Sequence, residues 1–121
     1  MSFVSNQIAY LIDKAIMLSA PYGEQIAGRA ALGDYLTDDI ANEWIDEDVF
    51  LLKGLVEKGI VNESVLVMYV KIVANFTTAS LGGEMYDNTI WTLTGLKSAP
   101  FWKKQRELAS ELLSQLNEIF Y

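Results

Sequence analysis

The chain has 121 residues, of which 51% are hydrophobic and 21% charged, a composition that fits one folded domain and excludes an intrinsically disordered chain. It contains neither cysteine nor histidine, which excludes disulfide bonds, thiolate and zinc sites, and catalysis by either side chain. A net charge of -7 disfavours direct binding to nucleic acid or anionic lipid. We therefore expect a single domain over residues 1–121 that binds no cofactor, no metal, no nucleic acid and no membrane.

The first residues show no pattern of a targeting signal. Residues 1–6 hold no basic side chain, and Asp13 and Lys14 interrupt the apolar run that follows. We therefore expect neither a signal peptide nor a membrane-spanning helix. The absence of cysteine fits a reducing compartment, and the cytoplasm is the predicted location.

Apolar residues at helical spacing predict a run of helices in the first part of the chain. The buried stripe of the first helix is formed by Ile8, Leu11, Ile12, Ala15 and Ile16. This helix should end where Pro21 and Gly23 follow. A second helix is predicted over residues 24–36, although Gly28 and Gly33 each disfavour it by about 1 kcal/mol relative to alanine.

Three further helices are predicted before residue 80. Thr37 or Asp38 should cap a short helix that holds Ile40, Ala41 and Trp44, and the next helix should end at Gly59. Residues 63–79 are apolar on most sides and exceed the usual strand length of about 5 to 6 residues. We predict this segment to be the central buried helix. Its apolar residues are Val65, Leu66, Val67, Met68, Val70, Ile72, Val73 and Phe76.

The C-terminal part predicts two more helices. One should follow Gly82 and Gly83, run over residues 85–94 and stop at Gly95. Ser98 should cap the last helix, with Pro100 in its first turn, where a missing N–H does no harm. The inner stripe of that helix consists of Phe101, Leu108, Leu112, Leu116 and Ile119 or Phe120. The expected fold is all-α, with six or seven antiparallel helices packed around the helix of residues 63–79.

The whole net charge arises from one stretch. Between Arg29 and Lys53 there are seven acidic residues and no basic one, while the other nine acids balance all nine lysines and arginines. Such a local field attracts basic partners and speeds their association. Tyr35, Trp44 and Phe50 lie among the acids, and aromatic residues are frequent anchors of protein interfaces. The stretch therefore predicts a surface for a basic protein partner.

The predicted partner-binding residues are Tyr35, Asp38, Asp39, Glu43, Trp44, Asp46, Glu47 and Asp48. Three of them, Asp39, Glu43 and Glu47, recur at intervals of four residues, which would set like charges on one helix face and destabilise it. A basic partner would relieve that repulsion. Two other interpretations stay open. A run of charges is commonly a solvated face, and Trp44 follows Ile40 at a spacing that suits the core better than an interface.

Clustered acids can also bind metal ions, but the pattern here does not fit. If Asp46 is the first position of a calcium loop, Asp48 is the third. Phe50 and Leu51 then stand where the loop requires an oxygen ligand and a glycine. With no histidine, no cysteine and no Gly-rich phosphate loop, the chain also lacks a recognisable catalytic motif. We therefore expect a binding protein rather than an enzyme.

The segment from Leu81 to Tyr121, LGGEMYDNTIWTLTGLKSAPFWKKQRELASELLSQLNEIFY, resembles the small helical immunity proteins of bacterial contact-dependent growth inhibition systems. The similarity extends over the full length of the chain. The resemblance implies a cytoplasmic antitoxin that binds the C-terminal toxin domain of a large adhesin, often a basic ribonuclease, and blocks its active site. The family has no invariant motif, so it assigns no functional residue to this chain.

The acidic stretch and the family resemblance lead to the same expected partner. A nuclease cleft rich in lysine and arginine attracts carboxylates that take the place of phosphates, and Tyr35 or Trp44 would supply an apolar anchor. We therefore expect a one-to-one complex with a cognate nuclease toxin. The alternative is a helical scaffold or regulatory subunit that forms a homodimer through the apolar helix around Val65 to Phe76.

Overall fold

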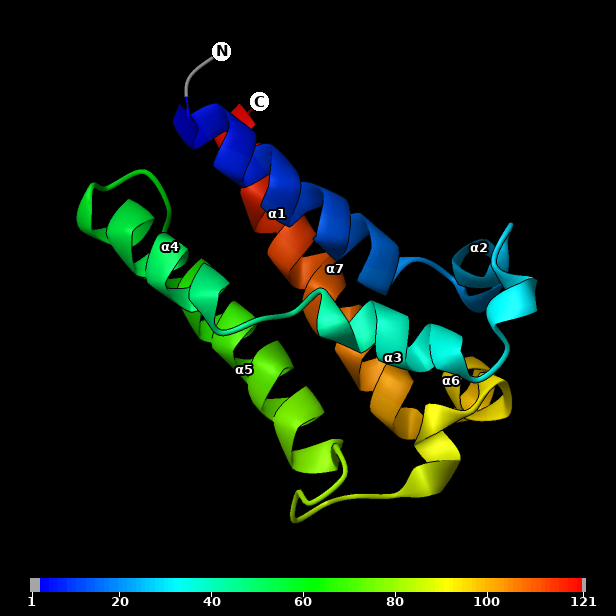
Figure 1. The fold of residues 1–121 in the computed structure, drawn as a ribbon. Helices are drawn as coiled ribbons and strands as arrows, with labels where there is room; N and C mark the ends of the chain where they lie inside the picture. The colour runs from blue at the N-terminus through cyan, green and yellow to red at the C-terminus, as the bar shows by residue number, and fades with distance from the viewer. Residues whose placement is uncertain (1–2, 121) are drawn as a thin grey trace.

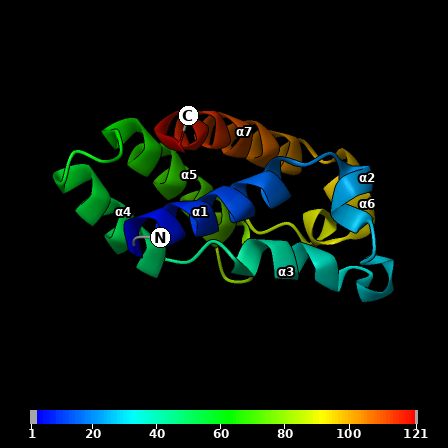
Figure 2. The ribbon, with the colours of Figure 1, turned by 90° about the horizontal axis from the view of Figure 1, so that it is seen from above.

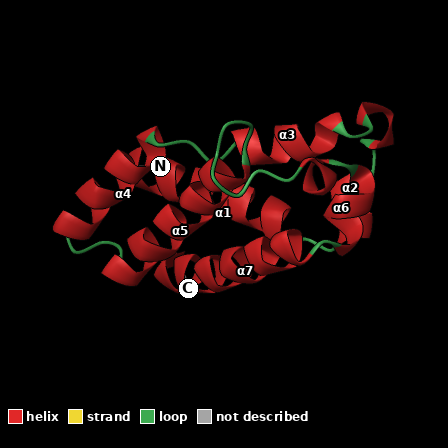
Figure 3. Ribbon diagram, turned by 90° about the horizontal axis from the view of Figure 1, so that it is seen from below, coloured by secondary structure: helices red, strands yellow, loops and turns green. Residues whose placement is uncertain are grey.

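The computed structural model describes the backbone of residues 3–120 and the side chains of residues 5–119, so the side chain of Phe120 lies outside the described part. Within these residues the chain is helical and contains no strand (Figure 3). The elements are α1 (Phe3–Ser19), α2 (Tyr22–Ile26), η1 (Ala30–Leu32), α3 (Tyr35–Asn42), α4 (Glu47–Glu57), α5 (Glu63–Ala79), η2 (Asn88–Trp91), α6 (Leu93–Ser98) and α7 (Pro100–Phe120). The predicted all-α fold is confirmed.

Helix α7, with 21 residues, is the longest helix of the described chain. It packs along α1 on one side and along α5 on the other, and its first turns contact α6 (Figure 1). Helices α4 and α5 form an antiparallel pair, and α1 and α7 run in opposite directions, so both ends of the described chain lie close together. Seen from above, α3 and α4 lie on the face opposite to α7 (Figure 2). The acidic stretch, which spans α3 and α4, therefore occupies one face of the molecule.

An aromatic cluster fixes the end of the bundle where α7 begins. Phe76, Trp91, Phe101 and Trp102 have ring centroids between 5.4 and 6.3 Å apart. The indole N–H of Trp102, which is fully buried, donates to the carbonyl of Ile90 at 2.6 Å. Because this N–H has a partner, the large ring is buried without the penalty of an unsatisfied donor.

The predicted helix over residues 24–36 is wrong. Its residues form α2, η1 and the start of α3, separated by turns at Gly28 and Gly33. These glycines have φ angles of 73° and 57°, a left-handed backbone that ends a helix and that glycine adopts without steric cost. The next helix consequently begins earlier than predicted. Asp34 precedes α3, and Thr37 lies buried inside it rather than at its cap.

The predicted helix over residues 85–94 is also wrong. That segment contains the end of the irregular connection 81–87, the short element η2 and the first residues of α6. Gly95, predicted to stop a helix, lies inside α6, where a Cβ atom would overlap the backbone of Thr89 and Ile90. Ser98 ends α6, and its hydroxyl donates to the carbonyl of Thr94 instead of capping α7. The last helix begins at Pro100, in agreement with the prediction that this proline lies in its first turn.

The bounds of α5 agree with the predicted helix 63–79, but its burial on nearly all sides is wrong. Val67 is 48% exposed and Val70 is 42% exposed, whereas Ile72 is fully buried. The reason is that α7 and α4 cover two sides of α5 and leave a third side open. In the first helix, Ile16 likewise lies outside the core, at 50% exposure.

The two sides of α5 should respond differently to truncation. Ile72→Ala removes fully buried atoms, and we expect it to lower the free energy of unfolding by about 2–5 kcal/mol. Val70→Ala removes atoms that already contact water and should cost less than about 1 kcal/mol. Urea unfolding of both variants checks this. Equal losses for the two variants would contradict the open side of α5.

Candidate functional site

The acidic stretch is divided between two helices. Helix α3 ends at Asn42 and α4 begins at Glu47, so residues 43–46 form a linker. Asp39, Glu43 and Glu47 therefore do not lie on one continuous helix face. The prediction that they repel one another along such a face is wrong. The acids at the start of α4 are instead favourably placed, because negative side chains in a first helical turn interact well with the helix dipole.

Two of the predicted partner-binding residues lie in the interior. Trp44 is 5% exposed and packs on Tyr69 with ring centroids 5.0 Å apart. Asp48 is 6% exposed and belongs to the buried side of α4. Neither side chain is accessible to a partner, so the prediction is corrected for both. The core alternative holds for Trp44.

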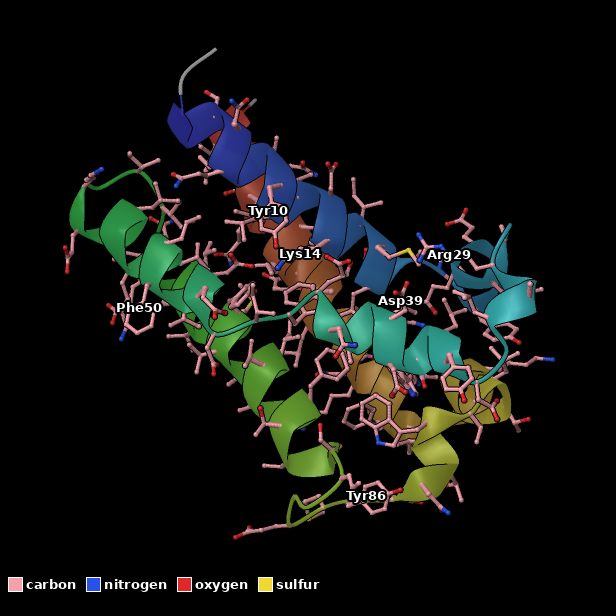
Figure 4. All side chains as sticks on the ribbon, viewed as in Figure 1. Tyr10, Lys14, Arg29, Asp39, Phe50 and Tyr86 are labelled. Atoms are coloured by element: carbon pink, nitrogen blue, oxygen red, sulfur yellow. The ribbon has the colours of Figure 1, made fainter. Side chains whose placement is uncertain are left out.

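A buried polar cluster, formed by Lys14, Asp48 and Tyr69 with the partly exposed Tyr10 at its edge, explains why an aspartate is inside. The Lys14 ammonium donates to the Asp48 carboxylate at 2.5 Å and to the Tyr69 hydroxyl at 3.1 Å. It also donates to the backbone carbonyl of Glu43. Figure 4 shows Tyr10 and Lys14 reaching from α1 toward the linker between α3 and α4. All three protons of the ammonium thus have acceptors, and α1 is joined to the linker, to α4 and to α5.

The two tyrosine hydroxyls complete the shell around Asp48. Tyr10 donates to Asp48 Oδ2 at 3.2 Å, and the Tyr69 hydroxyl lies 3.1 Å from the same oxygen and 3.3 Å from the Ile45 carbonyl. Burial, followed by the charge of Asp48, raises the pKa of both tyrosines. Burial lowers the pKa of Lys14, and Asp48 opposes that shift. Lys14 and Asp48 form the one ion pair among the described side chains.

The other predicted residues are exposed but face different hollows. Asp39 and Glu43 line a polar hollow of about 230 Å³ between α1 and α3, together with Tyr10 and Arg29. Figure 4 shows Arg29 and Asp39 near the C-terminal end of α1. Asp38 lines a second hollow, of about 290 Å³, beside the connection 81–87. The exposed carboxylates therefore spread along α3 and the linker instead of meeting at one point.

An apolar groove with a volume of about 530 Å³ lies between α4 and α5. The residues that line this hollow, the α4/α5 groove, are Asp46, Val49, Phe50, Val70, Val73, Ala74, Thr77 and Thr78. Phe50 is 71% exposed and points away from the bundle (Figure 4). The sequence pattern did not assign this groove. The available signal was that residues 63–79 are apolar on more sides than a helix packed against two neighbours can bury.

At the start of α3, an exposed aromatic residue lies beside an acid with a structural role. Tyr35, predicted as an anchor, is 77% exposed. The preceding Asp34 accepts a hydrogen bond from the backbone N–H of Leu93 at 2.8 Å, which ties the start of α3 to the start of α6. Sequence reasoning missed this role of Asp34, because the two residues are far apart along the chain.

Over the part of the chain that the structure describes, no group of three acidic side chains is placed to hold a metal ion. None of the helices there combines the length and the apolar character needed to cross a bilayer. Comparison of the chain with protein-family models, curated proteins and solved structures finds no match. The resemblance to helical immunity proteins therefore stays a prediction.

Breaking the buried ion pair should be costly. Lys14→Met leaves the Asp48 carboxylate buried without its cation, and we expect a loss of about 3–5 kcal/mol in the free energy of unfolding. The double variant Lys14→Met, Asp48→Leu removes both charges and should recover most of that loss. Urea unfolding of the two single variants and the double variant measures the coupling. Additive losses would show that the pair is not coupled.

The raised pKa of Tyr69 also predicts a pH dependence. In the unfolded chain Tyr69 ionises near its ordinary pKa of about 10, while the folded protein holds the proton, so its contribution to stability is present below about pH 10 and is lost as the pH rises further. Tyr69→Phe lacks this proton. The difference in unfolding free energy between wild type and Tyr69→Phe should therefore shrink above about pH 10. A difference that stays constant to about pH 11 would contradict the raised pKa.

Proposed function

We propose that the chain is an immunity protein that binds a basic nuclease toxin in a one-to-one complex and blocks its active site. One observation carries the proposal. Five carboxylates are exposed along α3, the linker and the start of α4, with no basic residue between Arg29 and Lys53. They are Asp38, Asp39, Glu43, Asp46 and Glu47.

These five exposed carboxylates, the acidic row, suit a cleft that binds a phosphate backbone. A nuclease holds phosphates with lysine and arginine, and the same cations pair with carboxylates. Steering by such a field raises the association rate toward about 10⁸ M⁻¹s⁻¹ at low salt. Tyr35 lies at one end of the row and offers an exposed ring for the apolar part of the contact.

The buried polar cluster supports an inhibitor more than an enzyme. Lys14 is the buried amine, and all its protons are donated to Glu43, Asp48 and Tyr69. Those bonds hold the linker from inside, so its acidic side chains are presented from a fixed backbone. A preformed surface loses less conformational entropy on binding and gains affinity for that reason.

A second candidate, the homodimer, is favoured by a different observation. Val67, Val70 and Phe50 are exposed on α5 and α4 and would gain from burial against another apolar surface. The charge weighs against it, because two copies would bring together chains that each carry -7. Sedimentation at low and high salt separates the two, since only a complex driven by opposite charges weakens as salt rises.

The charge reversal Asp39→Lys, Glu47→Lys tests the proposal. Both side chains are exposed, so the fold should persist. We expect the association rate with a cognate basic nuclease toxin domain to fall about tenfold at low salt and its salt dependence to flatten. Stopped-flow kinetics and protection of toxin-producing cells provide the measurements.

A matched control separates position from net charge. Glu57→Lys, Glu107→Lys changes the charge by the same amount at exposed positions away from the row. This control should associate and protect nearly as the wild type does. If both double variants bind and protect equally well, the acidic row is only a solvated face.

A further inference from the structure

We propose that the α4/α5 groove receives an amphipathic helix of a basic protein partner, with apolar side chains against Phe50 and Val70 and a lysine or arginine beside Asp46. The inference rests on the proposed function, because the partner is the same basic protein that the acidic row attracts. It adds a second contact region with a different chemistry.

The groove has the shape that a helix requires. Helix α5 has 17 residues and α4 has 11, so α5 continues past the start of α4 (Figure 1). Val70, Ala74 and Thr77 recur at intervals of four and three residues along the uncovered side of α5. Such a ridge fits the grooves between the side chains of another helix. That helix would lie against the part of α5 that continues past the start of α4.

The groove is more apolar than its residue types indicate. Thr77 donates its hydroxyl proton to the carbonyl of Val73 at 3.0 Å, and Thr78 donates to the carbonyl of Asn75 at 3.2 Å. Both hydroxyls are thus used within α5, and the methyl groups remain available to the groove. With Phe50 on the opposite wall, a partner side chain would meet carbon atoms on both sides.

The charge at the groove selects the occupant. Among the described lining residues Asp46 is the only charged one, and its carboxylate makes no capping hydrogen bond to α4. Glu47 is exposed beside it, and the Lys53 ammonium lies 5.4 Å from the centre of the Phe50 ring. A cation is therefore favoured at the Asp46 end. A second copy of this chain is disfavoured, because it brings a net charge of -7.

A short synthetic peptide of leucine and lysine, patterned as an amphipathic helix, is the probe. It is added to the full chain labelled with ¹⁵N, and affinity and shift changes are measured. We expect the peptide to change the backbone amide chemical shifts of Val49, Phe50, Val70 and Ala74. Val70→Asp should weaken peptide binding about tenfold. Val67→Asp is the matched control. It adds the same charge to a similarly exposed valine of α5 outside the groove, and it should bind as the wild type does.

Phe50→Ser provides a second variant, because Phe50 is 71% exposed and its loss should not unfold the protein. It too should weaken the peptide complex about tenfold, and with the toxin domain it should speed dissociation while leaving association nearly unchanged.

The proposal is overturned if Val70→Asp and Val67→Asp weaken binding equally, if the chemical-shift changes map to α1 and α3, or if a glutamate version of the peptide binds as well. A dimer of the free chain that Phe50→Ser dissolves would also overturn it. Failure of the peptide test leaves toxin inhibition through the acidic row intact, whereas failure of the charge reversal leaves the groove intact.

Discussion

The buried charge of Lys14 is the constraint on which the arrangement of the surrounding helices depends. An ammonium in the interior must have acceptors for its protons, because removing it from water costs several kcal/mol. The acceptors come from the linker, from α4 and from α5, at Glu43, Asp48 and Tyr69. Apolar packing alone tolerates small shifts between helices, but this set of bonds is satisfied in one arrangement. The cluster therefore fixes four parts of the chain relative to one another.

This constraint also shapes the surface. The carbonyls of Glu43 and Ile45 are bound from within by Lys14 and Tyr69, so the linker backbone is held although its side chains face water. The linker ends at Asp46 and leads directly into α4, whose first turn carries Phe50. The acidic row and the α4/α5 groove are consequently attached to the same rigid support. In the proposed complex, a partner bound at one of them would also be placed near the other.

The sequence predicted the long helices well because their information is local. Apolar spacing identified α1, α5 and α7, and Gly59 marked a real helix end with a φ of 72°. Glycines were less informative where a fold uses them differently: Gly33 breaks a helix and Gly95 permits a close contact inside one. The buried pair was missed, although a signal was present. Lys14 and Asp48 both fall on the inner stripes of their helices, and a lysine and an aspartate at such positions can be paired only through the interior.

The charges of this chain fall into two classes with different consequences. Asp48 and Asp34 are bonded within the fold, and their removal would leave other groups without partners. Asp38 and Asp39 are exposed in the middle of an acidic stretch, where their mutual repulsion weakens the folded state. Phe50 similarly remains in water although its burial would be favourable. Both features lower the stability of the isolated chain, and they lie on α3 and α4, the two helices that the linker joins. A partner that is basic and apolar removes both costs at once, which a partner of only one kind does not.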